Sequence, residues 1–280
     1  MIRTFLFVIF VIFSGLITLN YLDKNNPINL STKTCIVTGA SSGIGRELGL
    51  QMMQRGWKVI GIARRIHLLN EQQKTNPYLF TPIECDVSDL QQIHSTCEKI
   101  RSLNLHPTLF FLNAGMGKPQ CNDEQLVPIT KKTFNTNYFG ALAWIDEWLS
   151  SIKKDGGGTF VATLSVMTLM ALPGSSAYSS SKTALAHSFE SLRRQYLYEK
   201  IGFCSVFSGP VKTEMLKGTG EELPFTHTAT EEAEYIINQV FAGKKHIEPS
   251  WIYGIIFRVL SILPDWAILK LADLSTNNPK

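Results

Sequence analysis

The sequence has no large excess of either charge: 27 lysine and arginine residues are balanced by 23 aspartate and glutamate residues, a formal net charge of +4 over 280 residues. An excess this small and scattered argues against a nucleic-acid partner. Cysteine is scarce, and its five widely spaced residues form no CxxC pair. We therefore expect no disulfide framework and no metal site, but reduced thiols that lie mostly in the core. With 44% apolar and 18% charged residues, the chain can bury a sizeable core.

One long apolar run carries no charge. It covers residues 5–19, FLFVIFVIFSGLITL, and its apolar character continues almost to Asp23, which gives about 18 residues, near the lower limit for a membrane-spanning helix. A cleaved signal peptide is an alternative, but residues 18–21 offer no small-residue cleavage site. A buried helix is less favoured, because apolar side chains surround the whole circumference. We predict a single-pass N-terminal membrane anchor at residues 1–22 and a linker at residues 23–33, and the flanking charges do not set the orientation.

Beyond the linker, short and nearly continuous apolar runs alternate with helical stretches. Such runs are typical of strands that are covered on both faces, and the strand–helix–strand repeat predicts a parallel sheet with right-handed crossovers. We expect an α/β fold, a doubly wound, Rossmann-like parallel sheet, in one domain at residues 34–250. Its first helix opens at Ile44 and stops at Gly56. The expected strands are residues 34–38, 57–63, 82–86, 108–113, 158–164 and 202–208.

A glycine-rich turn, TGASSGIG, follows the first expected strand. Its glycines permit a tight turn and let backbone amides approach a pyrophosphate, and the N-terminus of the following helix supplies a positive field. Glycines after a strand can simply terminate it, but a position between a strand and an amphipathic helix is the context that a dinucleotide site requires. The candidate cofactor-binding residues here are Thr38, Gly39, Ser41, Ser42, Gly43, Ile44 and Gly45.

The ends of the next two strands indicate which dinucleotide binds. Arg64 and Arg65 stand where an NAD-selective site usually places an acidic side chain, and guanidinium groups favour a ribose 2′-phosphate. A solvated basic loop is the alternative. The pattern therefore favours NADP(H) over NAD(H). After the third strand, Asp86 and its neighbour Val87 are placed to meet the adenine, although Asp86 can equally cap the helix that begins near Ser88.

A tyrosine and a lysine share one helical face later in the chain. Tyr178 and Lys182 are four residues apart, and Ser165 lies 13 residues upstream at the end of the fifth expected strand. A tyrosine has a pKa of about 10, and a cation about 4 Å away at an effective dielectric of about 20 contributes roughly 4 kcal/mol, which would lower that pKa toward roughly 7 before desolvation opposes it. Ser165 can then bind a substrate carbonyl while Tyr178 supplies or removes the proton.

Together these features resemble the short-chain dehydrogenase/reductase family over nearly all of residues 33–245. The TGASSGIG turn looks like the nucleotide turn of that family, and Asn113, Ala114 and Gly115 look like its sheet-stabilising motif. The segment NYFG that begins at Asn137 resembles the helix motif whose asparagine holds a water in a proton relay.

The resemblance implies a Rossmann-like oxidoreductase with a role for each matching residue. Asn137 would be the fourth catalytic residue beside Ser165, Tyr178 and Lys182. Lys182 would also bond the nicotinamide ribose, the motif Asn113, Ala114 and Gly115 would adjoin the cofactor, and Val211 and Thr213 would meet the carboxamide. A homo-oligomer is also implied. The sequence departs from the family pattern at Leu112, where asparagine is usual, and at Ser208, where proline is usual, but neither change removes a reacting group.

The C-terminal part of the chain is apolar but interrupted. Residues 214–225 suit a substrate lid or a surface connection, and residues 228–231 form a plausible capping box. Within the tail, residues 251–280, the run 251–263 is too short to span a bilayer and contains Arg258. It suits an interfacial or substrate-covering helix pair, with a dimer contact or ordinary core as equal alternatives.

The leading hypothesis is a membrane-anchored, NADP(H)-dependent oxidoreductase that interconverts a carbonyl and an alcohol. The anchor and the apolar tail favour a lipophilic small-molecule substrate, such as a steroid, a retinoid or a long-chain ketone or aldehyde. A catalytically silent NADP(H)-binding scaffold or sensor at the membrane is the alternative. An epimerase or dehydratase of nucleotide sugars is disfavoured, because those relatives usually have a longer substrate domain and a differently spaced glycine turn.

Overall fold

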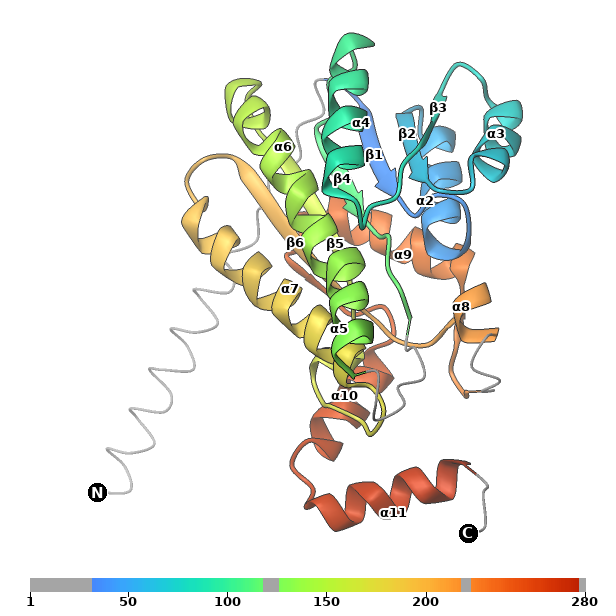
Figure 1. Cartoon of the computed structure of the whole chain (residues 1–280), viewed down its shortest axis with the longest axis vertical. Helices are drawn as coiled ribbons and strands as arrows, with labels where there is room; N and C mark the ends of the chain where they lie inside the picture. The colour runs from blue at the N-terminus through green and yellow to red at the C-terminus, as the bar shows by residue number, and fades with distance from the viewer. Residues whose placement is uncertain (1–31, 118–125, 218–222, 277–280) are drawn as a thin grey trace.

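A parallel sheet of seven strands forms the centre of the computed structural model, which describes residues 32–117, 126–217 and 223–276. The strand order is β3-β2-β1-β4-β5-β6-β9 (Figure 1). Because β1 lies between β2 and β4, successive strands extend the sheet in one direction and then in the other, as in doubly wound folds. The strands of this sheet are β1 (Thr34–Thr38), β2 (Lys58–Ala63), β3 (Phe80–Glu84), β4 (Leu109–Leu112), β5 (Gly158–Ser165), β6 (Ile201–Ser208) and β9 (His246–Ile247).

Helices cover both faces of this sheet and bury an apolar layer on each side. One face carries α4 (Leu90–Ser102), α6 (Gly140–Lys154) and α7 (Ser176–Gln195), and the other carries α2 (Gly43–Gln54), α3 (Ile66–Thr75) and α9 (Ala229–Phe241). The other elements are α5 (Leu126–Phe134), the π-helix η2 (Asn135–Phe139), the 3₁₀-helix η3 (Val166–Thr168), the paired short strands β7 (Val211–Lys212) and β8 (His227–Thr228), α8 (Glu214–Lys217), α10 (Trp251–Leu260) and α11 (Asp265–Thr276).

The alternation of side chains along a strand explains how one sheet serves two cores. In β4, Phe110 belongs to the layer under α4, α6 and α7, whereas the next residue, Phe111, belongs to the layer under α2 and α9. Phe110, Phe160 and Phe203 are aligned across β4, β5 and β6, with ring centroids 4.7 and 5.4 Å apart. Each buried phenylalanine contributes about 1.5–3 kcal/mol, so this ladder is a large part of the core.

A glycine in β2 makes room for a large neighbour in β3. A Cβ atom at Gly61 would lie 2.3 Å from Cζ of Phe80, whose ring is buried. Glycine is therefore needed at position 61 for β2 and β3 to pair, because a side chain there would collide with the Phe80 ring, which lies between the sheet and its helices.

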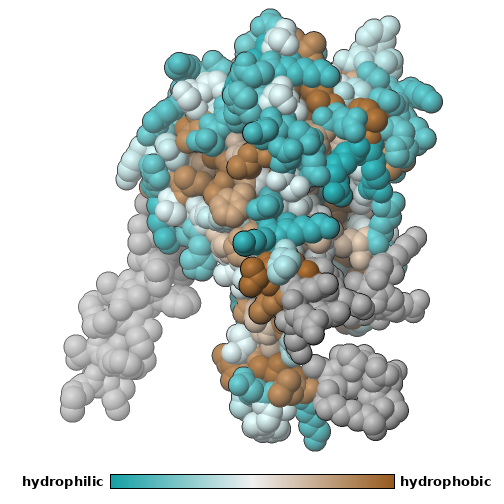
Figure 2. All heavy atoms as spheres, viewed as in Figure 1, coloured by the Kyte–Doolittle hydropathy of each residue, from teal (hydrophilic) through white to brown (hydrophobic). Residues whose placement is uncertain are grey.

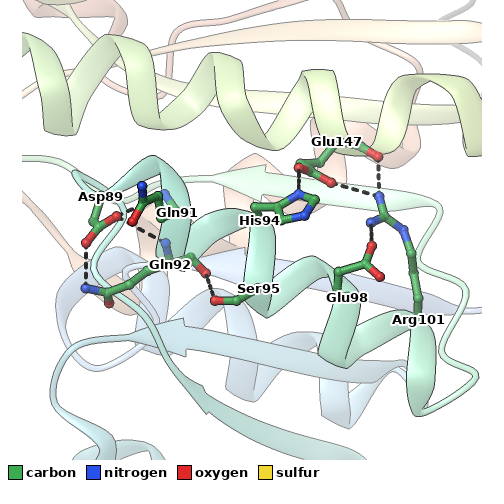
Figure 3. Close-up of polar contacts among 8 residues, drawn as sticks. All are labelled: Asp89, Gln91, Gln92, His94, Ser95, Glu98, Arg101 and Glu147. Atoms are coloured by element: carbon green, nitrogen blue, oxygen red, sulfur yellow. Dashed lines mark hydrogen bonds and ion pairs between the residues drawn. The ribbon is translucent and has the colours of Figure 1, made fainter.

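Polar side chains fasten α4 to α6 on the outside of the molecule (Figure 3). The Glu147 carboxylate of α6 contacts His94 Nδ1 at 2.6 Å and accepts from Arg101 Nη2 at 3.0 Å, and Arg101 also donates to Glu98 at 2.5 Å. The N-terminus of α4 is capped by Asp89, whose Oδ1 accepts from two backbone amides. The contacts of Glu147 keep the two outer helices together, whereas the Asp89 cap directly follows the Asp86–Val87 segment, since the Asp89 amide donates to the Asp86 carbonyl at 3.0 Å.

The six strands expected from apolar runs are confirmed, with ends that differ by at most two residues. No apolar run predicts β9 or the β7–β8 pair, because each of these strands has only two residues. Lys33, expected in the linker, already contacts the sheet, since its carbonyl accepts from the Lys58 amide at 2.8 Å. The capping box at Thr228 is confirmed.

Among the described residues, no helix is both long and apolar enough to cross a membrane. The anchor expected at residues 1–22 lies outside those residues. The four cysteines within them, Cys35, Cys85, Cys97 and Cys204, are free and buried, as expected.

Candidate active site

The residues singled out by the sequence lie at one edge of the sheet, where the parallel strands end. Each of the strands β1 to β6 ends just before, or at, one of the expected site segments. The edge includes the point between β1 and β4 where the strand order reverses, and open α/β sheets bind ligands outside such points.

The glycine turn between β1 and α2 is packed too tightly for side chains. A Cβ atom at Gly45 would lie 2.3 Å from the carbonyl oxygen of Gly39 and 2.5 Å from Nδ2 of Asn113. Gly39 has φ +69° and Gly43 has φ +53°, both in the left-handed region, and a Cβ atom at Gly43 would be 3.1 Å from Thr213. The turn is therefore built for a close approach of backbone to a ligand, with α2 starting at its end.

Thr38 joins this turn to the segment after β4. Its hydroxyl accepts from the backbone amides of Asn113 and Ala114, each at 3.0 Å, and donates to the Phe111 carbonyl at 3.3 Å. The Asn113 side chain completes the link, because its Nδ2 donates to the Thr38 carbonyl and its Oδ1 accepts from Thr163. The resemblance to a sheet-stabilising motif thus has a physical basis here.

Arg65 lies over the serines of the glycine turn. Its guanidinium donates to Ser41 Oγ at 3.0 and 3.2 Å and to Ser42 Oγ at 2.5 Å, and its remaining edge forms an ion pair of 3.0 Å with Glu214 at the start of α8. A cation beside two hydroxyl groups can bind a phosphate. One guanidinium nitrogen of Arg65 is already paired with the Glu214 carboxylate.

Arg64 and Asp86 face each other across the ends of β2 and β3, with 3.6 Å between Nη1 and Oδ2. Burial raises the pKa of the Asp86 carboxyl, but hydrogen bonds from Ser88 and the charge of Arg64 outweigh it, so the pKa is lowered overall. Asp86 accepts from the Ser88 amide and hydroxyl. The residue that caps α4 is Asp89, so the capping role considered for Asp86 is wrong.

Four further residues expected at the cofactor lie along the same edge. Val87 follows Asp86 and is buried, and Val211 forms part of β7 and is buried. Thr213 donates to the Val211 carbonyl at 3.3 Å and packs against Gly43. Ile44, in the first turn of α2, is partly buried beside the core under α2 and α9.

The Ser165 hydroxyl lies beside the Tyr178 phenol, above the end of β5. Burial raises the pKa of the Tyr178 phenol, and the nearby Ser165 hydroxyl offsets only part of that rise. The direction is opposite to the one expected from the charge of Lys182, because the loss of water around the phenol decides the pKa. Tyr178 is therefore protonated in the free protein.

Lys182 is buried one turn after Tyr178. Its Nζ donates to the Thr163 carbonyl at 2.6 Å, and burial lowers the pKa of its ammonium group to about 8. Gly115 brings the chain close to this group, since a Cβ atom there would lie 3.3 Å from Lys182 Nζ and 3.4 Å from Asn137 Oδ1. Lys182, Asn137 and Gly115 thus converge, although they come from three different elements.

Asn137 lies in the π-helix η2, an insertion that often marks a functional site. Its side chain is buried and binds backbone: Oδ1 accepts from the Met116 amide at 2.7 Å, and Nδ2 donates to the Met116 carbonyl and to Ser181 Oγ, both at 3.1 Å. In this structure Asn137 therefore positions the segment after β4 next to α7.

Sequence reasoning missed three residues that organise this site. Thr163 supports both Asn113 and Lys182, and its position two residues before Ser165 on β5 was a usable signal, since alternate residues share a face. Glu214 pairs with Arg65 across 149 positions of sequence, and no local pattern indicates it. Glu232 is fully buried beside His227, at 3.0 Å, and burial raises the pKa of its carboxyl although the nearby Ser208 and His227 oppose the rise.

A dinucleotide with a 2′-phosphate fits the residues present. The turn excludes side chains at three glycines, two arginines follow β2 where an acidic residue would favour NAD, and a buried ammonium lies near Gly115. Arg65, Ser41 and Ser42 would hold the phosphate end, and Lys182 would face the ribose that is nearer to Tyr178.

Comparison with known proteins supports this geometry. Residues 33–224 match the sequence profile of a family described as short chain dehydrogenase. An uncharacterized oxidoreductase of Myxococcus xanthus is 27% identical over 242 residues, which cover 84% of this chain and 94% of that protein. Among solved structures, a short-chain dehydrogenase from Streptomyces avermitilis superposes with a TM-score of 0.75 at 22% identity, covering 88% of this chain and 97% of that one. A short chain dehydrogenase from Burkholderia cenocepacia, in complex with NADP, gives 0.70 at 23% identity, covering 88% and 98%.

Proposed function

Because the chain belongs to the short-chain dehydrogenase family, we propose that it is an NADP(H)-dependent oxidoreductase that interconverts a carbonyl group and an alcohol on a lipophilic substrate. The observation that carries the proposal is the contact of Ser165 with Tyr178 beside the buried Lys182. Two hydroxyls and a cation in one place can bind a carbonyl oxygen and move a proton to it.

NADP(H) is favoured over NAD(H) by the chemistry at the end of β2. Arg64 and Arg65 supply two cations there, and Ser41 and Ser42 add hydroxyl donors beside Arg65. The structural relative from Burkholderia cenocepacia was solved with NADP. When bound, the nicotinamide supplies or accepts the hydride.

Each catalytic side chain then has one task at a stated atom. Ser165 Oγ donates to the carbonyl oxygen of the substrate, and the Tyr178 phenol gives that oxygen its proton in reduction or removes it in oxidation. The Lys182 ammonium, held by the Thr163 carbonyl, stabilises the phenolate that remains. Asn137 keeps Met116 and α7 in register and so acts as a positioning residue in the geometry observed.

The lipophilic substrate and the membrane anchor rest on apolar segments at the two ends of the chain. The uncharged run at residues 5–19 supports a single-pass anchor at residues 1–22, and exposed apolar side chains on α10 and α11 lie beyond the sheet edge that carries the site. Both are part of this proposal, as is a homo-oligomer, which the family resemblance implies.

The test is to follow the absorbance of reduced nicotinamide over a panel of carbonyl compounds with increasing chain length. Each added methylene that enters an apolar site should raise kcat/KM by about fourfold, since a buried CH₂ contributes about 0.8 kcal/mol. Equal kcat/KM for short polar and long apolar ketones contradicts the lipophilic substrate.

The reaction itself is tested by Tyr178→Phe, with Tyr78→Phe as the matched control on an exposed tyrosine. Loss of the proton donor should lower turnover by about 10²–10⁴-fold and leave NADPH affinity nearly unchanged. Turnover that survives Tyr178→Phe contradicts the mechanism. NADPH binding without turnover on any carbonyl of the panel would instead support the scaffold alternative.

A further inference from the structure

The inner side of α10 is fixed to the domain by specific contacts. Tyr253 is buried, and its hydroxyl donates to the Pro224 carbonyl at 2.6 Å. Arg258 Nη1 donates to Glu248 at 2.9 Å. A Cβ atom at Gly254 would lie 2.6 Å from the Glu248 carboxylate, so a side chain at position 254 would collide with this ion pair. The side of α10 opposite Tyr253 therefore faces outward.

That outward side and the following helix carry large apolar residues that the described part of the chain does not cover. On α10 the exposed apolar residues are Trp251, Ile255, Ile256 and Val259, and their spacing of four, one and three residues places them on one helical face. Trp251 is 61% exposed and Trp266 is 71% exposed, which alone leaves on the order of 200–300 Å² of tryptophan surface in solvent. The full set, called here the hairpin face, is Trp251, Ile255, Ile256, Val259, Ile262, Trp266 and Leu269.

The figures show how far this surface stands from the domain. In Figure 1, α11 lies apart from the body, below the sheet edge that carries the site. Figure 2 shows hydrophobic residues gathered on the same projection, whereas much of the body above it is hydrophilic. An exposed apolar patch of this extent marks an interaction site.

We propose that the hairpin face docks on the surface of a lipid bilayer. The inference rests on the proposed function in one respect, the membrane anchor at residues 1–22. Residues 23–31 separate that anchor from the first described residue and can reach about 30 Å when extended. The eight residues of β5 are about 26 Å long, so such a linker can pass the length of the sheet and bring the hairpin face to the same bilayer.

The chemistry of the hairpin face favours lipid over a second copy of the chain. Tryptophan is enriched at membrane–water interfaces, and here Trp251 begins the face and Trp266 lies near its other end. Arg258 is the one charged residue of α10, and its guanidinium is paired with Glu248 beside the apolar stripe. An anchored chain also meets its bilayer at a high effective concentration, whereas a second copy must diffuse to it.

Docking there would place the bilayer next to the substrate side of the site. The helix α10 packs against η3, the turn that directly follows Ser165, and a Cβ atom at Gly209, just after β6, would lie 2.5 Å from Ser250 at the start of α10. A lipophilic substrate dissolved in the bilayer would thus reach Ser165 along α10. This extends the proposed substrate class to molecules that partition into membranes.

The test uses the full chain reconstituted in phosphatidylcholine vesicles, with ordinary or brominated acyl chains. Bromine quenches tryptophan emission at short range, and three of the five tryptophans, Trp57, Trp144 and Trp148, are buried in the domain. Docking should therefore remove up to about two fifths of the emission, from Trp251 and Trp266. The double variant Trp251→Phe, Trp266→Phe should lose the quenching.

A charged variant shows whether the hairpin face itself makes the contact. Ile255→Glu combined with Val259→Glu should abolish quenching while NADPH binding stays unchanged, and Leu103→Glu, an equally exposed position at the far end of α4, should leave quenching intact. Quenching that survives the double glutamate variant overturns the proposal.

Two other outcomes are also decisive. A chain that floats with the vesicles but shows no quenching overturns the docking surface and leaves the anchor standing, and cross-linking of two chains through Ile255→Cys would then identify a second copy as the occupant. A chain that is quenched but reduces no carbonyl supports the docking surface and contradicts the proposed function alone.

Discussion

Replacing Glu214 with glutamine should tighten the binding of NADP(H) and leave the binding of NAD(H) unchanged. The Glu214 carboxylate contacts Arg65 Nη1 at 3.0 Å, while the other guanidinium nitrogens donate to Ser41 and Ser42. A 2′-phosphate at Arg65 would therefore compete with Glu214 for the same cation. NAD(H) has no such phosphate and meets no competition.

The size of the effect follows from the exposure of the pair. The Arg65 and Glu214 side chains are 42% and 67% exposed, and exposed ion pairs contribute about 0–1 kcal/mol. Glu214→Gln should thus lower the Kd of NADPH by at most about fivefold. Arg65→Met removes charge-assisted hydrogen bonds of about 1.5–3 kcal/mol and should raise that Kd by roughly 10- to 150-fold.

The assay is a titration of the full chain with NADPH and with NADH at low and at high salt. Glu98→Gln is the matched control, because Glu98 also forms an exposed ion pair, with Arg101, but lies on the outer side of α4 away from the glycine turn. The gain from Glu214→Gln should shrink as salt screens the pair. Weaker NADPH binding in Glu214→Gln, or an equal gain for NADH, would refute the competition.

Three further predictions concern the turn and the buried groups. Gly45→Ala should abolish cofactor binding in a titration, because its Cβ would lie 2.3 Å from the Gly39 carbonyl oxygen. Gly49→Ala on the same helix is the control, because its Cβ would meet no atom nearer than 3.5 Å, and it should raise the unfolding free energy by about 0.5–1 kcal/mol. Burial raises the pKa of Glu232, so its ionised form destabilises the fold as pH rises through that pKa. The Tm gain of Glu232→Gln over the wild type should therefore grow as the pH rises above the ordinary carboxyl pKa, and a constant difference would contradict this. Lys182 has a pKa of about 8, so it should take up about half a proton when NADP(H) binds near pH 8 and none near pH 6. Calorimetry in buffers of different ionisation enthalpy measures this proton uptake, and Lys182→Met is the control.

Local signals predicted the parts of this molecule that depend on neighbours in sequence. The strands β1 to β6 are continuous apolar runs because both of their faces are covered, and the turn at Gly39 is visible because only glycine fits there. The short strand β9 has no such signal, since it follows charged residues and pairs with β6 through only two positions.

Contacts between distant parts of the chain explain what sequence reasoning did not find. Arg65 was expected to bind the cofactor, but its partner Glu214 is 149 residues away. The spacing of Tyr178 and Lys182 predicted a shared face, yet the direction of the Tyr178 pKa depends on how much water the fold removes, which spacing does not contain.

The protonation of these two groups also bears on the direction of the reaction. In the free protein burial raises the pKa of Tyr178, so the phenol holds its proton, and the same burial lowers the pKa of Lys182 to about 8, so the ammonium is charged near neutral pH. Carbonyl reduction needs a protonated phenol and a cation that stabilises the phenolate left behind, which is the state already present. In the proposed mechanism, alcohol oxidation must first remove the phenol proton against the desolvation that holds it, so the protonation state of the free protein suits proton donation to a carbonyl oxygen.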